Sequence, residues 1–211
     1  MPAHHITFPA DGLSLEGLFY VPEQRTQVPG LVICHPHPLR GGDMYNNVVM
    51  GLANAFIEAG HAVLCFNFRG VGKSTGSHGE GIAEQEDAKG ALTWMAAQTG
   101  VDAERLLLAG YSFGARVALS VTATDPRVKG IIAVAPPVSR SDLPSLEPHQ
   151  GPKLFFCGDA DPVCPAEALT ALVGRLPEPK GLFILPGGDH FFVGKEAALG
   201  QRAVTWFREH I

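Results

Sequence analysis

The sequence predicts an α/β fold in which helices cover both faces of a sheet. Short apolar runs of strand length alternate with longer segments whose apolar residues recur at helical spacing. This alternation follows two segments, residues 6–8 and 13–21, that are typical of an antiparallel pair of strands. In such an alternation each helix returns the chain across the sheet before the next strand, so the later strands run parallel.

The expected elements follow from the apolar pattern, since strands buried on both faces appear as continuous apolar runs. The strands expected after the antiparallel pair are residues 30–34, 62–66, 106–109, 130–134, 153–157 and 181–185. The expected helices are residues 46–59, 81–98, 166–176 and 194–210, with a further helix directly after Ser112. No repeat, low-complexity tract or linker interrupts the pattern, so residues 1–211 are expected to form a single domain.

The composition is that of an ordinary globular protein. The chain has 211 residues, a formal net charge of −5 and 45% hydrophobic residues, and this mild acidity predicts neither nucleic acid nor membrane as partner. No apolar run is long enough to span a bilayer, and residues 1–8 lack the pattern of a signal peptide, so a cytoplasmic location is expected. The four cysteines show no C-x-x-C spacing, which favours free thiols over a zinc site.

The motif Gly110-Tyr111-Ser112-Phe113-Gly114 follows the apolar run at residues 106–109 and leads directly into an apolar helix. G-x-S-x-G in this strand–turn–helix setting is the signature of a nucleophile elbow. A serine on so sharp a turn has a strained backbone, and the two glycines let the strand and the helix pass close to each other. Ser112 is therefore the candidate nucleophile, and the backbone N–H of Phe113 is a candidate donor to an oxyanion.

A nucleophilic serine needs a histidine to accept its proton and a carboxylate to orient that histidine. In parallel sheets, functional residues gather beyond the carboxyl ends of the strands. His190 follows the last expected strand, and two acids, Asp159 and Asp161, follow the strand before it. The chain order serine, acid, histidine is one of the known orders of a catalytic triad. The residues alone leave the choice between the two acids open.

The segment Gly70-Val71-Gly72-Lys73-Ser74 imitates a phosphate-binding loop. The full motif requires a glycine five residues before Gly72, where the backbone wraps the phosphates, and the chain has Asn67 there. A nucleotide site is therefore not expected, and no cofactor is predicted.

Taken together, the motifs resemble those of the α/β-hydrolases over essentially the whole chain. The four motifs are Gly110-Tyr111-Ser112-Phe113-Gly114, Gly158-Asp159-Ala160-Asp161-Pro162-Val163, Gly187-Gly188-Asp189-His190 and Asn67-Phe68-Arg69-Gly70-Val71-Gly72-Lys73-Ser74. The last is similar to the family's D-x-R-G-x-G-x-S loop. The run His35-Pro36-His37-Pro38 resembles a small capless subgroup related to dienelactone hydrolases that uses serine in place of cysteine. The resemblance implies about eight mostly parallel strands with the second antiparallel, no lid domain, and Asp161 as the acid.

The resemblance also implies a second oxyanion donor in the loop that is rich in histidine and proline. Pro36 and Pro38 have no N–H to donate. Alignment with the family's H-G-x loop implies the backbone N–H of His37, with Leu39 as the alternative. A different interpretation makes His35 and His37 a pair of metal ligands. No nearby cysteine or acid cluster completes such a site, and no metal is predicted.

Three further interpretations concern polar residues outside the triad. Arg69 is expected to brace loops through hydrogen bonds. Glu84, Glu86 and Asp87 are expected to form a solvated helix face, and Asp189 a solvated turn. None of these residues is assigned a role in catalysis.

The predicted function is a serine hydrolase that cleaves small or exposed carboxylic esters through an acyl-enzyme, with a small acyl substrate and water as its partners. The alternatives are a thioesterase or an amide-cleaving enzyme on the same triad, and a non-catalytic binding protein on the same fold. The rims of the cleft are expected at residues 39–45, 135–150 and 191–192.

Overall fold

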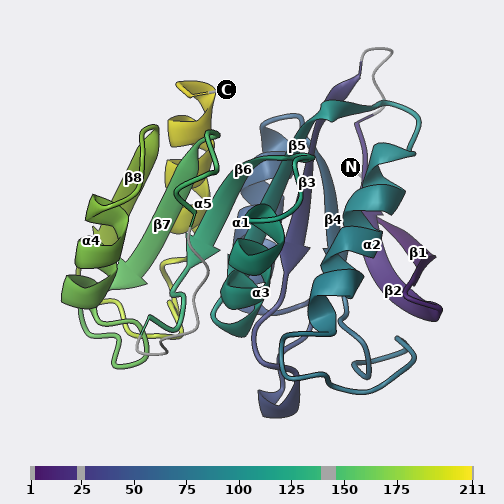
Figure 1. Cartoon of the computed structure of the whole chain (residues 1–211), viewed down its shortest axis with the longest axis horizontal. Coiled ribbons are helices and arrows are strands. Elements are labelled where there is room, and N and C mark those ends of the chain that lie inside the picture. The colour runs from purple at the N-terminus through teal and green to yellow at the C-terminus, as the bar shows by residue number, and fades with distance from the viewer. Residues whose placement is uncertain (1–2, 23–26, 139–145, 211) are drawn as a thin grey trace.

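The computed structural model describes residues 3–22, 27–138 and 146–210. Within these residues a sheet of eight strands runs through the molecule in the order β1-β2-β4-β3-β5-β6-β7-β8 (Figure 1). The strands are β1 (His4–Ala10), β2 (Leu13–Tyr20), β3 (Val28–Cys34), β4 (Ala62–Phe66), β5 (Val101–Tyr111), β6 (Val128–Val134), β7 (Lys153–Gly158) and β8 (Lys180–Leu185).

Strand β2 runs antiparallel to both of its neighbours, β1 and β4. Every other pair of neighbouring strands is parallel. The arrangement confirms the mostly parallel sheet with an antiparallel second strand. As a consequence, the strands from β3 to β8 all end at the same edge of the sheet, which we call the carboxyl edge.

Helices cover both faces of this sheet (Figure 1). On one face α1 packs against α5, on the other α2 packs against α3, and α4 lies against β7 and β8. The helices are α1 (Asn47–Glu58), α2 (Glu84–Ala96), α3 (Phe113–Thr122), α4 (Ala166–Gly174) and α5 (Glu196–Arg208), with a short 3-10 helix η1 (Pro38–Arg40). Across the described ranges, no helix combines the length and the apolar character needed to cross a membrane.

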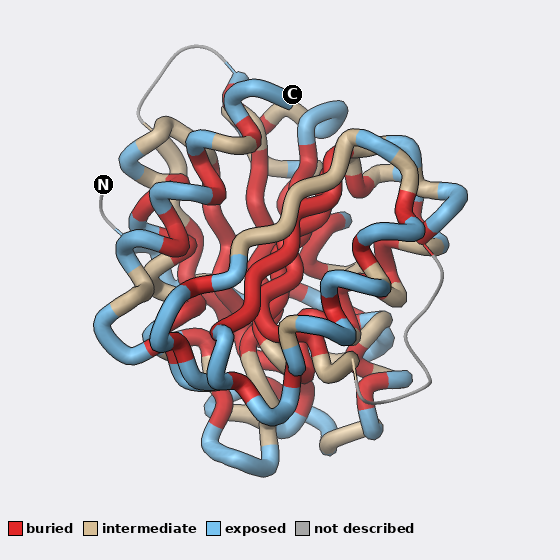
Figure 2. Tube along the Cα trace, turned by 90° about the vertical axis from the view of Figure 1, so that its left-hand side faces the viewer, coloured by how far each residue is buried: buried red, intermediate tan, exposed pale blue. Residues whose placement is uncertain are grey.

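The core follows the sheet. Figure 2 shows buried segments through the middle of the molecule and exposed segments around them. Strands β4 and β7 are buried at every residue, and β3 and β6 at all but one. This burial explains why these strands appear in the sequence as continuous apolar runs rather than as alternating patterns.

Strand β5 begins earlier than the apolar run at residues 106–109 indicates. Residues 103–105 are exposed, so no apolar signal marks them as part of a strand. They are skipped at a shift of register between Pro29 and Gly30, and β3 pairs with β5 on both sides of them, Pro29 with Asp102 and Gly30 with Leu106. Pairing with a distant strand, rather than local sequence, therefore sets this boundary.

Residues 135–152 connect β6 to β7, which is where a lid domain would be inserted. Independent domains need about 50 residues or more, so this connection is too short to hold one. The fold thus agrees with the absence of a lid. Residues 139–145, a part of the expected rim at residues 135–150, lie outside the described residues.

The expectation of a solvated acidic face on α2 is wrong for Glu84 and Asp87, which are both fully buried. Asp87 accepts hydrogen bonds from Nη2 of Arg69 at 2.8 Å and from its backbone N–H at 2.9 Å. Arg69 also donates to Asp11 at 3.2 Å, which confirms it as a brace between loops. Glu86 is exposed, as expected. Both acids contact the connection between β4 and α2, Glu84 through Gly79, Gly81 and His78 and Asp87 through Arg69.

Candidate active site

Ser112 alone forms the turn between β5 and α3. Its backbone has φ 54° and ψ −114°, a region that residues with a Cβ rarely occupy. Such a conformation costs about 1–3 kcal/mol and persists only where the surroundings enforce it. One such contact is the hydrogen bond from the Ser112 N–H to the carbonyl of Val134, at the end of β6, at 2.8 Å. The strained turn that the motif predicts is confirmed.

The two glycines of the motif are required by close contacts. A Cβ on Gly110 would lie 2.2 Å from the carbonyl oxygen of Gly114. A Cβ on Gly114 would lie 2.3 Å from the carbonyl oxygen of Cys34 and 2.4 Å from that of His35. Both distances are far below van der Waals contact, so only glycine fits. As a result the start of α3 lies directly against the end of β3, and the loop after β3 comes next to Ser112.

Asp161 lies on the loop that follows β7, and its carboxylate is enclosed by donors. One oxygen, Oδ1, accepts the backbone N–H groups of Val163 and Cys164 at 2.8 and 3.0 Å. The other, Oδ2, lies 2.8 Å from Nδ1 of His190. Burial raises the pKa of Asp161, but the hydrogen bonds from His190, Cys164 and Val163 outweigh this effect and hold the pKa below its ordinary value. Asp159, the alternative acid, is exposed.

His190 lies between the acid and the serine. Its Nε2 is 2.9 Å from Oγ of Ser112, while its Nδ1 faces Asp161. An ionised carboxylate can only accept, so Nδ1 carries the proton and Nε2 is left as the acceptor for the serine hydroxyl. The hydroxyl of Tyr111 donates to the carbonyl of His190 at 2.5 Å and holds its backbone in place. The structure therefore brings together Ser112, Asp161 and His190.

The loops that carry the acid and the base are joined by their backbones. The N–H of Ala160 donates to the carbonyl of Gly188 at 2.9 Å. A Cβ on Gly158 would lie only 2.0 Å from the same carbonyl oxygen. The distance between Asp161 and His190 is therefore set by a tight backbone contact rather than by the two side chains alone.

The two residues that carry the candidate oxyanion donors are neighbours through their side chains. Phe113 is the first residue of α3, where backbone N–H groups have no partner within the helix. The ring of His37, on the loop after β3, lies 5.0 Å from the ring of Phe113. The N–H of Leu39, the alternative second donor, instead points to Nδ1 of His37 at 3.2 Å. This geometry favours His37 over Leu39.

His35 has a structural role. Its ring is fully buried, and Nδ1 donates to the carbonyl of Pro36 at 2.6 Å while Nε2 accepts the N–H of Phe68 at 3.1 Å. Burial lowers the pKa of His35 to about 4, so the ring is neutral at pH 7. Both ring nitrogens are occupied, and a His35–His37 metal site does not fit this geometry. Among the described residues, no group of three or more histidine, cysteine, aspartate and glutamate side chains could hold a metal ion.

Comparison with known protein families identifies the family of this chain. The profile of the X-Pro dipeptidyl-peptidase family (S15) matches residues 11–150, well over half of the chain. The chain belongs to this family. The matched part contains Ser112 and ends before Asp161 and His190, so two of the three residues that the structure brings together lie outside it.

Solved structures agree over nearly the whole length of this S15 family member. An α/β serine hydrolase homologue from Coxiella burnetii is 37% identical, with a TM-score of 0.87 and 97% of each chain covered. XC6422 from Xanthomonas campestris, described as a serine hydrolase without a lid, is 33% identical, with a TM-score of 0.83 over 98% of this chain and 96% of that one. These similarities confirm an α/β-hydrolase fold without a lid and a hydrolase-type enzyme.

Two curated relatives add to this picture. The uncharacterized protein RP471 of Rickettsia prowazekii is 34% identical over 181 residues, which cover 82% of this chain and 76% of that protein. Thiohydrolase apmlB of Arthrinium phaeospermum is 34% identical over 129 residues, which cover 60% of this chain. The match spans only 40% of the thiohydrolase.

Sequence reasoning missed His78, which lies beside both oxyanion candidates. Its side chain is 9% exposed, and its ring lies 5.2 Å from that of His37 and 5.4 Å from that of Phe113. Nδ1 of His78 is 2.8 Å from Oε1 of the buried Glu84, whose carboxylate also accepts two backbone N–H groups of the loop before α2. The only feature of the sequence near His78 is a glycine-rich turn, and this does not indicate which residues the histidine contacts.

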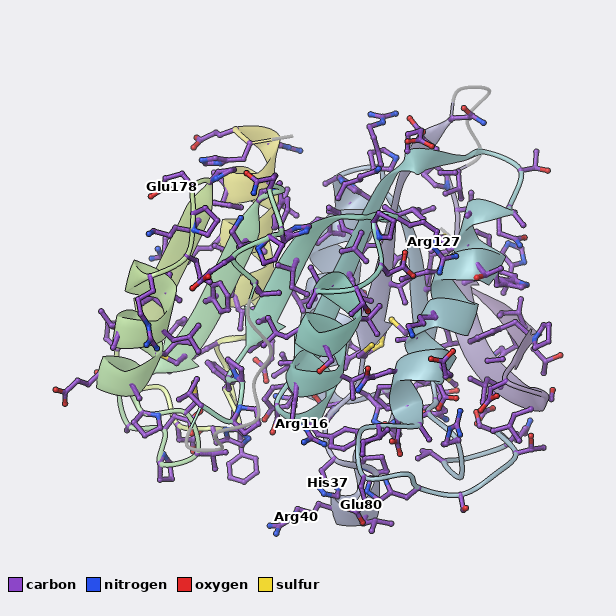
Figure 3. All side chains as sticks on the ribbon, viewed as in Figure 1. His37, Arg40, Glu80, Arg116, Arg127 and Glu178 are labelled. Carbon is purple, nitrogen blue, oxygen red and sulfur yellow. The ribbon has the colours of Figure 1, made fainter. Side chains whose placement is uncertain are left out.

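Arg116, on α3, was also missed. Its guanidinium lies over the ring of Phe113 at 5.9 Å, and Nη2 donates to the carbonyl of Glu80. Figure 3 shows Arg116 and Glu80 at the carboxyl edge together with His37 and Arg40. Arg116 thus ties the loop before α2 to the first turn of α3, beside the candidate oxyanion donor.

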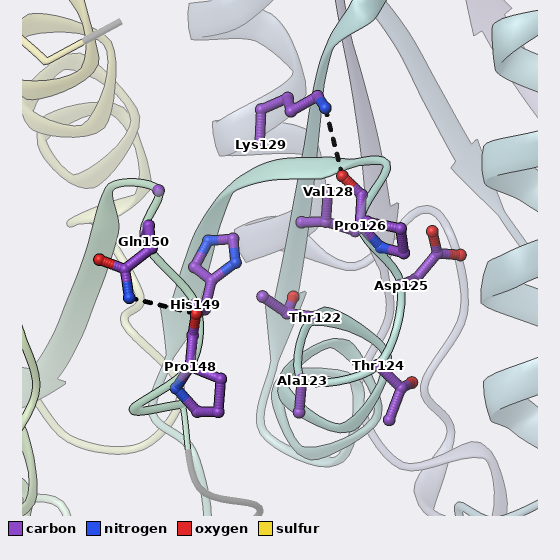
Figure 4. A pocket seen from close by; sticks show the side chains of 11 residues that line it. Thr122, Ala123, Thr124, Asp125, Pro126, Val128, Lys129, Pro148, His149 and Gln150 are labelled. Carbon is purple, nitrogen blue, oxygen red and sulfur yellow. Dashed lines mark hydrogen bonds between the residues drawn. The ribbon is translucent and has the colours of Figure 1, made fainter.

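A cavity of about 380 Å³ opens at the other edge of the sheet (Figure 4). It is lined by the end of α3, the start of β6 and the segment before β7, including Thr122, Lys129 and His149. The amino ends of parallel strands face away from their carboxyl ends, so this cavity is not part of the site around Ser112.

Proposed function

We propose that the protein is a serine hydrolase that cleaves small or exposed carboxylic esters through an acyl-enzyme. The observation that carries this proposal is the unbroken line of contacts from Oγ of Ser112 to Nε2 of His190 at 2.9 Å, and from Nδ1 of His190 to Oδ2 of Asp161 at 2.8 Å. An imidazole held in this tautomer, with its free nitrogen on the hydroxyl, is what a general base requires.

The proposed acylation step begins when Oγ of Ser112 attacks the ester carbonyl and its proton passes to Nε2 of His190. The negative charge that develops on the carbonyl oxygen is held by the backbone N–H groups of Phe113 and His37. The lowered pKa of Asp161 keeps its carboxylate ionised at neutral pH, which stabilises the imidazolium that forms. His190 then gives the proton to the leaving oxygen, and the bond between acyl carbon and leaving oxygen breaks.

Deacylation repeats the same steps with water. His190 removes a proton from the water as it attacks the acyl carbon, and the proton is returned to Oγ of Ser112 when the acid leaves. The short connection at residues 135–152 supports an open site, because no inserted domain covers the carboxyl edge. An open site suits small esters and ester groups exposed on larger molecules.

A thioester is the second candidate substrate, and the similarity to thiohydrolase apmlB favours it. Amide cleavage is a third, because the family is named for a peptidase. All three reactions use the same acyl transfer and differ in the leaving group. The triad itself does not discriminate between an alcohol, a thiol and an amine as leaving group. A purely binding role is less well supported, since Ser112, Asp161 and His190 are all present and in contact.

The test is hydrolysis of short p-nitrophenyl esters by the wild type, by Ser112→Ala and by the control Ser120→Ala, which removes a hydroxyl from within α3, eight positions later. We expect Ser112→Ala to lose at least about 10³-fold in kcat and to lose labelling by a fluorophosphonate. Ser120→Ala should keep both. Equal turnover and labelling by all three proteins would contradict the proposal.

A panel of matched esters, thioesters and X-Pro amides with the same acyl group then separates the three reactions. A kcat/KM for the thioester that exceeds that for the ester by more than the difference in their intrinsic reactivity would replace the ester proposal by the thioesterase one. A preference for the amide would favour peptidase activity instead.

A further inference from the structure

Exposed apolar side chains gather at the carboxyl edge. Six of the seven large apolar side chains that are exposed among the described residues lie on loops that follow strands at this edge. These six are Leu39, Tyr45, Ile82, Val163, Phe191 and Val193. The seventh, Ile184, lies on the edge strand β8. Exposed apolar residues are normally scattered singly, so their concentration at the edge where Ser112 lies points to an apolar ligand.

Phe191 lies beside His190. Its ring meets that of His190 edge to face, with centroids 6.0 Å apart, and 64% of the residue is exposed. The next residue, Phe192, is fully buried and packs against Tyr111. Its backbone has φ 55°, a strained value for phenylalanine, and this turn separates the buried ring from the exposed one.

The backbone of Phe191 is held from both sides. Its N–H donates to Oδ1 of Asp189 at 2.9 Å, and its carbonyl accepts from Nδ2 of Asn47 at 3.0 Å. The same amide group of Asn47 also donates to Glu196 at 2.7 Å, so Asn47 is itself fixed. An exposed aromatic ring on a restrained and strained backbone is a pre-formed contact surface rather than a loosely attached side chain.

The chemistry of acyl transfer decides which part of the substrate this ring meets. His190 must reach the leaving oxygen in order to protonate it, so the leaving group departs on the side of His190. The oxyanion is held on the other side, at Phe113 and His37. A ring packed against His190 therefore lies on the side from which the leaving group departs and not on the side of the oxyanion.

We propose that Phe191, with Val193 two residues later in the chain, forms an apolar subsite for the leaving group, so that the preferred substrates are esters of apolar alcohols, aromatic ones above all. This inference rests on the proposed ester hydrolysis. The bond between Oγ of Ser112 and the acyl carbon forms as the bond from that carbon to the alkoxy oxygen breaks. The serine proton reaches the alkoxy oxygen through His190, and a neutral apolar alcohol leaves.

The experiment uses two ester series. One keeps the butyryl group and varies the alcohol from methyl to butyl to benzyl, and the other keeps methanol and varies the acyl chain. Both kcat and KM are measured for the wild type, Phe191→Ala, Phe191→Trp and Ile184→Ala. Ile184 is a matched control because it is also an exposed apolar residue, but it lies on β8 and outside the loops of the site.

We expect Phe191→Ala to lower the ratio of kcat/KM for benzyl butyrate to that for methyl butyrate by about 10-fold or more, which is the usual effect of losing one apolar contact in a pocket. Phe191→Trp should keep most of the ratio, and Ile184→Ala all of it. The order of preference in the acyl series should not change in any variant.

Two outcomes would overturn the inference while leaving the proposed function intact. In the first, Phe191→Ala lowers kcat/KM for all esters by the same factor. In the second, it changes the preference among acyl chains and leaves the preference among alcohols unchanged. A wild type that hydrolyses no ester and is not labelled by a fluorophosphonate would instead overturn the proposed function and this inference with it.

Discussion

The carboxylate of Asp161 lies 2.8 Å from Nδ1 of His190, while Asp159, two residues earlier on the same loop, is exposed. Of the two acids, Asp161 is therefore the one in contact with His190. We expect Asp161→Asn to lower kcat for ester hydrolysis by about 10⁴-fold, because an amide no longer fixes the tautomer of His190. Asp159→Asn is the matched control and should stay within about twofold of the wild type. A comparable loss in both variants would contradict the assignment.

The strained backbone of Ser112 has a consequence for stability. We expect Ser112→Gly to abolish ester hydrolysis and yet to raise the free energy of unfolding by about 1 kcal/mol, because glycine adopts φ 54° without a steric cost. Urea unfolding measures this change, and Ser120→Gly serves as the control. Ser120 lies within α3, where glycine should lower the free energy of unfolding by roughly 0.5 kcal/mol. Equal losses in both variants would show that the turn stores no strain.

The glycines of the elbow should not tolerate a methyl group. A Cβ at position 110 would lie 2.2 Å from the carbonyl of Gly114, so we expect Gly110→Ala to unfold at a much lower temperature than the wild type or to fail to fold. Gly174→Ala is the control, since a Cβ there meets no atom within 4 Å. On helix α4 this change should raise the free energy of unfolding by about 0.5–1 kcal/mol. Thermal melts of both variants test the contrast.

Glu84 and Glu86 lie on the same helix but differ in burial. Loss of the Glu84 carboxylate would leave the N–H groups of Gly79 and Gly81 without an acceptor and would remove the contact to His78. We expect Glu84→Ala to lower the free energy of unfolding by about 2–4 kcal/mol, since each buried unsatisfied group costs about 1–3 kcal/mol. Glu86→Ala, which breaks only an exposed pair with Lys89, should change it by less than about 0.5 kcal/mol.

Three histidines should make the fold sensitive to mild acid. Burial lowers the pKa of His35, His61 and His149 to about 4, with the charges of Arg105 and Arg208 adding to the effect at His61. The unfolded chain binds these protons near its ordinary histidine pKa of about 6.5, so it binds more protons than the folded chain between the two values. The free energy of unfolding therefore keeps its full value above about pH 6.5. It decreases as the pH falls from there towards 4.

Replacement of one of these histidines tests that account. Between pH 7.5 and pH 5, each histidine should lower the free energy of unfolding by on the order of 2 kcal/mol. We expect His61→Phe, whose ring can keep the packing against Phe56, to reduce the loss between these two pH values by that amount. Urea unfolding at both pH values provides the measurement. An identical loss in wild type and variant would show that His61 does not bind a proton on unfolding.

Much of this protein is determined by local sequence. The alternation of apolar runs and amphipathic segments predicts the parallel strands and the helices, because burial on one or both faces imposes a period on the chain. The motif around Ser112 predicts the strained turn for a different local reason, since a serine between two glycines at a junction of strand and helix has few allowed backbone conformations. The carboxyl ends of the last two strands likewise indicate where the acid and the base are found.

Only the tertiary structure decided which side chains meet. Ser112 and His190 are 78 residues apart, and their contact depends on the order of the strands in the sheet. The packing of His78 against His37 likewise depends on loops that come together from different strands. A periodic pattern records how exposed a face is on average, but it carries no information about the partner that covers it. Long-range contact is therefore what turned a serine on a sharp turn into one member of a hydrogen-bonded triad.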